Sequence, residues 1–147
     1  MNKLLTEFSA ILQSAPKRLV DVDDSRAEQK PPSGGWSKKE ILGHLIDSAS
    51  NNHQRFVRGQ LNPRLEFPEY QQDSWVAAQS YATAPWPDLV NLWLLYNRHL
   101  LHLLRHMPEA AWSHQISVGG KTPVAMSAVA EDYLRHLNHH LNQILPR

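Results

Sequence analysis

Two histidines near the C-terminus have the type and spacing needed to hold a metal ion together. His136 and His140 are four residues apart in the string EDYLRHLNHHLNQI. If this string is helical, the two rings project from adjacent turns with their Cβ atoms about 6 Å apart, so both can coordinate one cation. Two ligands do not make a complete site, and a third must come from another helix. A pair of hydrogen-bonded histidines at the rim of the core remains the alternative.

The composition restricts which other residues can contribute. The chain of 147 residues contains nine histidines and no cysteine. Disulfides, thiol nucleophiles and sulfur ligands are therefore excluded, and any metal site must be built from His, Asp and Glu.

The charge and hydropathy patterns exclude other classes of partner. Fifteen basic and 14 acidic side chains give a net charge of +1, without the basic surface expected of a nucleic-acid-binding protein. No apolar run approaches the roughly 18 residues of a membrane span, and Thr6 and Glu7 interrupt any signal-peptide core. We expect a cytoplasmic protein that binds neither nucleic acid nor membranes.

Helical geometry places the histidine pair relative to the core. A helix advances about 100° per residue, and the apolar residues of the last helix then span an arc from about 20° to 160° when His136 is set at zero. His140 lies within this arc and His136 at its margin, whereas His139 lies on the polar side.

A second helix supplies a candidate for the third ligand. His44, Asn51 and Arg55 share a polar stripe that borders an apolar stripe. Polar groups at the edge of a core cost free energy unless they are paired or bound, so the similar placement on two helices predicts one shared pocket. There Asn51 and Arg55 would orient a substrate carboxylate or carbonyl. The alternatives are a buried, satisfied His44 and a structural ion pair of Arg55 with Asp47 or Glu66.

The histidine spacing alone is not selective. His102 and His106 have the same separation, but the apolar arc of their helix is centred about 140° away, so we expect both to be solvated. No general base stands out either. Asp47, Glu131 and Asp132 are nearby in sequence, but the same arithmetic places them off the pocket, and a contact to a ligand histidine is an equal alternative.

Four helices are expected to position these residues. They are the segment around Leu4–Leu12, which Pro16 ends; Ser37 to Arg58, which begins with a capping box of Ser37 and Glu40; the segment from Pro87 to about Met107; and the segment from near Pro123 almost to the C-terminus.

The connections are less regular. Leu61–Pro85 reads as a long connection with a short helical turn around Asp73–Ala82, and HQISVGGKTPV reads as a Gly-Gly turn in a small hairpin. The pattern predicts an all-α four-helix bundle in a single domain over residues 1–147. The long second connection means that its topology need not be simple up-and-down.

Several strings also resemble a known family. GWSKKEILGHLIDSASNNHQRF, DSWVAAQSYATAPW, LVNLWLLYNRHLLHLL and EDYLRHLNHHLNQI resemble, in this order, the DinB-like superfamily, and most closely its YfiT-like branch of metal-dependent hydrolases. The resemblance covers roughly residues 30–147. It implies a four-helix bundle with a metal ion, commonly zinc or nickel, on three histidines that match His44, His136 and His140.

The resemblance also implies a function. Three protein ligands with an open coordination position are typical of a catalytic metal site, which favours a metal-dependent hydrolase with a small-molecule substrate. Some relatives are similar to thiol S-transferases, so transfer of a low-molecular-weight thiol is an alternative. A non-catalytic metal- or ligand-binding module is another, and a homodimer remains open.

Overall fold

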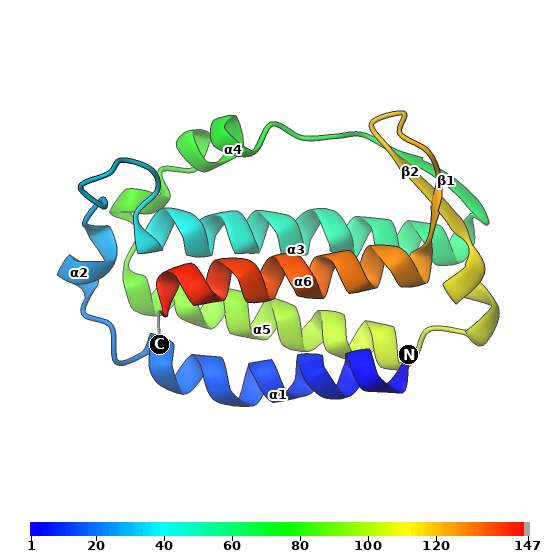
Figure 1. Cartoon of the computed structure of the whole chain (residues 1–147), viewed down its shortest axis with the longest axis horizontal. Helices are drawn as coiled ribbons and strands as arrows, with labels where there is room; N and C mark the ends of the chain where they lie inside the picture. Colours follow the sequence, from blue (N-terminus) through cyan, green and yellow to red (C-terminus); the bar gives the residue numbers. More distant parts are fainter. Residues whose placement is uncertain (146–147) are drawn as a thin grey trace.

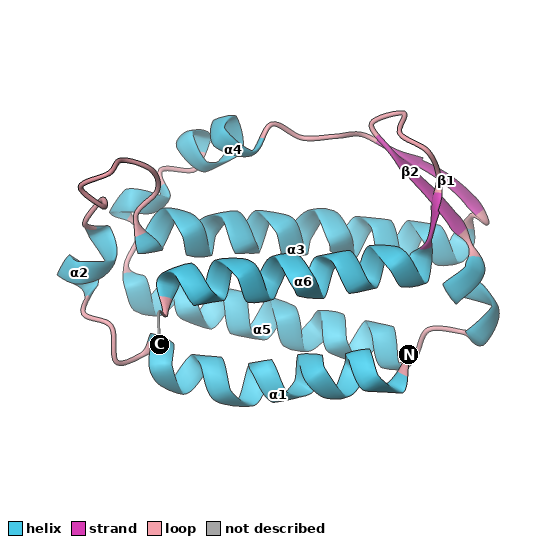
Figure 2. Cartoon of the chain, viewed as in Figure 1, coloured by secondary structure: helices cyan, strands magenta, loops and turns pink. Residues whose placement is uncertain are grey.

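The computed structural model describes residues 1–145, and most of them are helical (Figure 2). Four long helices form a bundle within this range: α1 (Asn2–Leu19), α3 (Lys38–Leu61), α5 (Trp86–Arg105) and α6 (Met126–Ile144). The shorter elements are α2 (Asp24–Glu28), α4 (Gln72–Ala78) and the 3₁₀ turns η1 (Tyr81–Thr83) and η2 (Glu109–Ser113). The predicted all-α four-helix bundle is confirmed.

The topology is not simple up-and-down. Figure 1 shows α3 and α5 running in one direction and α1 and α6 in the other. Because α3 and α5 are consecutive long helices that run in the same direction, the chain between them must return along the whole bundle. That return is the long connection expected between Leu61 and Pro85, and α4 and η1 lie where a helical turn was predicted.

The start of α3 follows the sequence signal. Ser37 Oγ accepts a hydrogen bond from the Glu40 backbone N–H, and the Ser37 N–H donates to Glu40 Oε2 at 2.8 Å. This reciprocal capping box satisfies two N–H groups that the first turn leaves unpaired. The helix continues past the predicted end at Arg58, through the buried Gly59 to Leu61, just ahead of Pro63.

The prediction that Pro16 ends the first helix is wrong. α1 continues to Leu19, and the Val20 N–H donates to the Pro16 carbonyl at 3.1 Å. Proline in the last turn removes only one intrahelical hydrogen bond, while the continued turn buries Leu19 completely. The polar stretch that follows contains the short helix α2, which the sequence analysis did not identify.

A small sheet closes one end of the bundle. β2 (Gln115–Val118) pairs antiparallel with β3 (Val124–Ala125), and Gly119 and Gly120 both have positive φ in the turn between them. The predicted hairpin is therefore confirmed. The sequence analysis missed β1 (Arg64–Phe67), which pairs parallel with β2. A four-residue strand inside a proline-bearing connection has too little periodicity to be recognised.

The core lies between the four long helices. Trp93 of α5, Phe56 of α3 and Leu137 of α6 are completely buried there. A polar pair crosses this core, because the Tyr133 hydroxyl donates to Asn97 Oδ1 at 2.5 Å. The packing of α3 against α6 is the contact that matters for the histidines.

Candidate metal centre

Three histidine rings converge where α3 packs against α6. One ring nitrogen each of His44, His136 and His140 can be chosen so that all three lie within 4.8 Å of one another. The Nε2 atoms of His44 and His136 are 2.9 Å apart. His44 is completely buried, and the two α6 histidines are half-buried. The structure thus brings together the three residues that the sequence analysis selected.

The antiparallel packing of two helices explains this convergence. His44 lies two turns after the capping box that starts α3, and His136 and His140 lie in the second half of α6, which runs back along α3 (Figure 1). The i, i+4 spacing of the α6 pair aligns both rings on one face, and their centroids are 4.5 Å apart.

Neighbouring side chains orient two of the rings. His140 Nδ1 lies 2.8 Å from Gln143 Oε1, while Gln143 Nε2 lies 3.2 Å from His139 Nε2. This amide orientation places the His140 proton on Nδ1 and leaves its Nε2 lone pair free. His44 packs against Trp36, with ring centroids 4.9 Å apart, and its Nδ1 has no hydrogen-bond partner among residues 1–145.

The surroundings keep the rings neutral. Burial, followed by the neighbouring histidines, lowers the pKa of His44 to about 3. Burial likewise lowers the pKa of His136 to about 4, and it lowers the pKa of His140. Neutral imidazole is the form that donates a lone pair to a metal ion.

These residues fit a divalent transition-metal ion. Nitrogens bound tetrahedrally to one ion through bonds of about 2.0–2.1 Å lie about 3.3 Å from each other, and the Nε2 atoms of His44 and His136 are 2.9 Å apart. The cluster contains three ring nitrogens with lone pairs, but one shared proton can pair only two of them. A single cation can bind all three.

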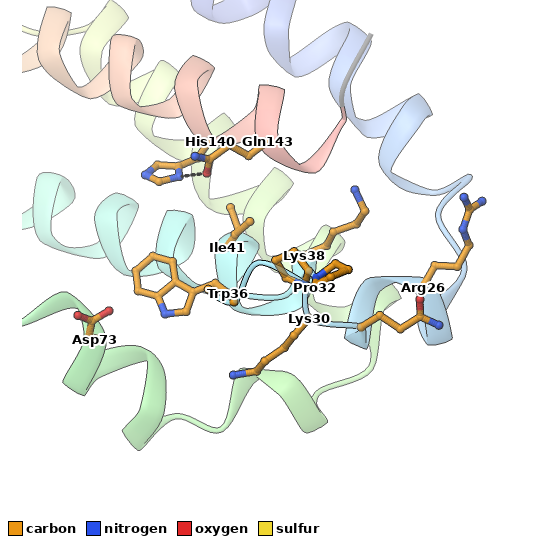
Figure 3. A pocket seen from close by; sticks show the side chains of 13 residues that line it. Arg26, Lys30, Pro32, Trp36, Lys38, Ile41, Asp73, His140 and Gln143 are labelled. Carbon is orange, nitrogen blue, oxygen red and sulfur yellow. Dashed lines mark hydrogen bonds between the residues drawn. The ribbon is translucent and has the colours of Figure 1, made fainter.

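Two hollows reach the histidines from different sides. The first, here called the His140 cavity, has a volume of about 830 Å³ and is lined by His140, Trp36, Ile41 and residues of the 26–38 segment. In Figure 3, the indole of Trp36, Ile41 and the His140 ring lie around it, with Asp73 of α4 at its edge. The cationic side chains of its lining are Arg26, Lys30 and Lys38.

The second hollow, here called the His136 cavity, has a volume of about 570 Å³. Its lining comes from α3, the segment after β1, the β2–β3 hairpin and α6. Its polar lining includes Ser48, Asn52, Arg55, Tyr70 and His136.

Arg55 and Asn51 have different positions in the structure. Arg55 lines the His136 cavity, whereas Asn51 lines another hollow beside Phe67 and Trp75 and donates to the Asp47 carbonyl at 2.9 Å. The cavity-facing amide is that of Asn52. Its helical-wheel position is about 80° from His44, within the apolar stripe of this helix, so the helical periodicity did not indicate that Asn52 faces the cavity.

The carboxylates also differ from the sequence-based expectation. Glu131 and Asp132 line the His136 cavity rather than lying off the pocket, because the cavity is open beyond the polar edge of α6. Asp47 is buried away from the histidine rings and accepts hydrogen bonds from the Tyr81 hydroxyl and from Gln79, both at 2.7 Å.

The remaining histidines lie outside the cluster. His102 and His106 are exposed, as predicted. The sequence analysis did not single out His53, which contacts the Tyr96 hydroxyl at 3.2 Å and packs against His99.

Comparison with known proteins identifies the family. A model of the DinB superfamily matches residues 7–144. The chain belongs to the DinB superfamily. Within the described residues, no helix of this DinB protein is long and apolar enough to cross a membrane.

Curated relatives of this DinB protein carry similar names. It is 24% identical over 147 residues to a candidate metal-dependent hydrolase of Bacillus mycoides strain KBAB4, covering 98% of this chain and 83% of the relative. It is 23% identical over 143 residues to another such protein, from Bacillus cereus strain ATCC 10987, covering 95% of this chain and 80% of the relative.

Solved structures share the fold. YfiT from Bacillus subtilis, described as a probable metal-dependent hydrolase with an unusual four-helix bundle topology, matches with a TM-score of 0.80 and 20% identity over 97% of this chain and 82% of YfiT. A mycothiol-dependent maleylpyruvate isomerase matches with a TM-score of 0.81 and 17% identity, over 98% of this chain but only 60% of the isomerase.

Proposed function

We propose that His44, His136 and His140 bind one divalent metal ion and that this centre hydrolyses a small-molecule substrate. The main support is the convergence of three neutral ring nitrogens within 4.8 Å, at a position reached by two cavities. The names of the Bacillus relatives agree with this proposal. An all-imidazole ligand set favours zinc or nickel over magnesium or calcium, which prefer oxygen ligands.

The chain's own residues prepare the site for such chemistry. Burial holds the imidazoles neutral, so no proton has to leave before they act as ligands. Gln143 orients the ring of His140. Three protein ligands leave a coordination position open. When bound, the ion supplies Lewis acidity, which acidifies a coordinated water or thiol and polarises a carbonyl oxygen.

The His136 cavity holds the carboxylates that could move a proton. Asp132 pairs with Arg135, and both are exposed at the rim of this cavity. Glu131, the preceding residue on α6, is exposed in the same lining. Glu131 and Asp132 are better placed than Asp47 to act as a general base, because the Asp47 carboxylate already accepts a hydrogen bond from the Tyr81 hydroxyl.

A second candidate function is the transfer of a low-molecular-weight thiol. Its support is the fold shared with a mycothiol-dependent isomerase, together with the size and charge of the His140 cavity. A hydrolase needs only one cavity for an organic substrate, whereas a transferase needs room for two reactants. Arg26, Lys30 and Lys38 would suit an anionic thiol in the larger cavity.

Metal content tests the proposed centre directly. Protein purified without an affinity tag is analysed for bound metals, before and after incubation with zinc or nickel salts. We expect about one ion per chain in the wild type and a clear loss in His44→Ala and His140→Ala. His102→Ala is the matched control, because it also belongs to an i, i+4 histidine pair but is exposed. A wild type that stays metal-free after both additions would contradict the proposal.

A further inference from the structure

The His136 cavity contains a half-buried cation, Arg55, that has no anionic partner among the residues that the structure describes. Within residues 1–145, no ion pair closer than 4.0 Å involves Arg55. Burial lowers the pKa of its guanidinium, and the nearby Tyr70, Asp132 and Glu69 offset that effect only in part. An arginine nevertheless stays protonated in proteins, so the cavity wall carries a positive charge that no ion pair within residues 1–145 neutralises.

The guanidinium is held by contacts that leave its hydrogen-bonding edge largely unused. It lies over the Phe67 ring, 5.2 Å from the centroid, and Nη1 donates to Asn52 Oδ1 at a long 3.4 Å. Its Nε is buried without a hydrogen-bond partner. An arginine offers five N–H donors in a planar fork, so most of this fork is available to a ligand.

The acidic residues that line the cavity are poorly placed to act as the anionic partner of Arg55. Glu69 pairs with Lys121 at 2.8 Å, and Asp132 pairs with Arg135. Glu131 is exposed to solvent on α6. Two of the three acidic side chains are therefore already paired and the third is exposed, which leaves Arg55 as the group that a bound anion would satisfy.

The cavity also connects this cation to the histidine centre. Ser48 and Arg55 are seven residues apart on α3, which places their Cα atoms about 10 Å apart along the helix axis. Ser48 Oγ lies 3.5 Å from His136 Nδ1. A small molecule anchored at Arg55 can thus extend along α3 to His136 within one cavity of about 570 Å³.

We infer that Arg55, with Asn52 beside it, forms a carboxylate-binding subsite, and that the substrate of the histidine centre is a carboxylic acid anion. The assignment of a substrate rests on the proposed metal-dependent function, but the subsite itself does not. A planar carboxylate matches the guanidinium fork. A phosphate dianion is a poorer match, because one cation would face two negative charges in a cavity that also contains three acidic residues.

Tyr70 adds a neutral donor to the same lining. Burial, followed by the charge of Asp47, raises its pKa to about 12, so the phenol keeps its proton at neutral pH. A phenol O–H can donate to a carboxylate oxygen without adding charge.

Binding of simple acids tests the subsite. The probes are benzoate, 3-phenylpropanoate and hexanoate, each compared with its uncharged amide and with inorganic phosphate, by calorimetry on zinc-loaded wild type. We expect at least one acid to bind about tenfold more tightly than its amide, as expected for a charge-assisted pair, and more tightly than phosphate. Equal binding of acids and amides, or preferential binding of phosphate, would overturn the inference.

Variants separate this subsite from the metal centre. Arg55→Met keeps the apolar stem over Phe67 and should abolish the preference for acid over amide, and Arg55→Lys should retain part of it. Arg58→Met, an exposed change three residues away, should leave the preference intact. The preference should also persist in His44→Ala, in which the proposed metal centre is removed. Its loss there, or its survival in Arg55→Met, would show that the acids bind elsewhere.

Discussion

The Nε2 atoms of His44 and His136 lie 2.9 Å apart, although the residues are 92 positions apart in the chain. Two neutral imidazoles can share one proton across such a contact, but His140 adds a third lone pair to the same place. Burial lowers the pKa values of His44 and His136, and these rings are therefore neutral at neutral pH. The following predictions depend on this cluster and on the contacts that hold it.

Metal addition should stabilise the protein. An ion that binds only the folded chain at 100 times its dissociation constant stabilises it by about 2.7 kcal/mol, or on the order of 5–10 °C in melting temperature for a domain of this size. The measurement is thermal unfolding with and without zinc. His136→Ala should lose the shift, and His106→Ala should keep it. An equal shift in both variants would indicate zinc binding at another site.

Gln143 should strengthen metal binding through His140. Its Oε1 accepts the His140 Nδ1 proton, which orients the ring and leaves Nε2 available. Removing such a contact typically lowers metal affinity about 10–100-fold. We expect this loss in Gln143→Ala and partial recovery in Gln143→Glu, measured by competition with a chelating dye. Asn142→Ala, an exposed neighbour, is the control. Wild-type affinity in Gln143→Ala would exclude the orienting role.

The metal-free protein should lose stability in mild acid. The unfolded chain binds protons on His44 and His136 below pH 6.5, whereas the folded chain does so only near pH 3 and pH 4. Between these values the unfolded state holds more protons, so the free energy of unfolding falls as the pH decreases from 6.5 towards 4. Well above pH 6.5, both histidines are neutral in the folded and the unfolded chain, so they no longer make the free energy of unfolding depend on pH.

Urea unfolding in the presence of a chelator, at pH 7.5 and pH 5.0, measures this effect. His44→Gln removes one of the titrating groups and should reduce the difference between the two pH values. His102→Gln, an exposed change, should retain the wild-type difference. Identical pH dependence in wild type and His44→Gln would contradict the prediction.

Gly43, next to the proposed ligand His44, should not tolerate a methyl group. A Cβ at this position would lie 2.1 Å from Cδ2 of Tyr81, and Tyr81 is held in place by its hydrogen bond to Asp47. Although alanine is normally favoured in a helix by up to about 1 kcal/mol, overpacking should make Gly43→Ala destabilising by roughly 1–3 kcal/mol.

Gly59→Ala provides the comparison on the same helix. Its Cβ would meet the flexible tip of Met126, 2.6 Å from Cε, which can move aside. Chemical denaturation should therefore show a much smaller effect than in Gly43→Ala. Equal destabilisation of the two variants would mean that the Tyr81 contact is not the cause.

Reaction assays should separate hydrolysis from thiol transfer. Zinc-loaded protein is incubated with a panel of carboxylate-bearing esters and amides, and in parallel with glutathione, bacillithiol or mycothiol and an electrophile. The proposed hydrolase cleaves an ester or amide without thiol, and His140→Ala abolishes this turnover. Metal-dependent thiol consumption without such cleavage would instead favour the second candidate function.

The sequence by itself determined the four long helices and most of the faces they bury, and it selected the three candidate histidines. The capping box at Ser37, the turn at Gly119 and Gly120, and the spacing of His136 and His140 are local patterns of side chains on a regular backbone, so they can be read without the fold. The continuation of α1 past Pro16 was missed because burial of Leu19, a tertiary effect, compensates the lost hydrogen bond.

Only the tertiary structure decided what surrounds those histidines. The parallel course of α3 and α5, the pairing of β1 with β2 and the open side of α6 depend on contacts between residues far apart in sequence. These contacts place Asn52 rather than Asn51 in the His136 cavity. They leave Arg55 without a carboxylate partner within residues 1–145. Helical periodicity predicts which face of a helix is buried, but not where the packing of several helices leaves space for a ligand.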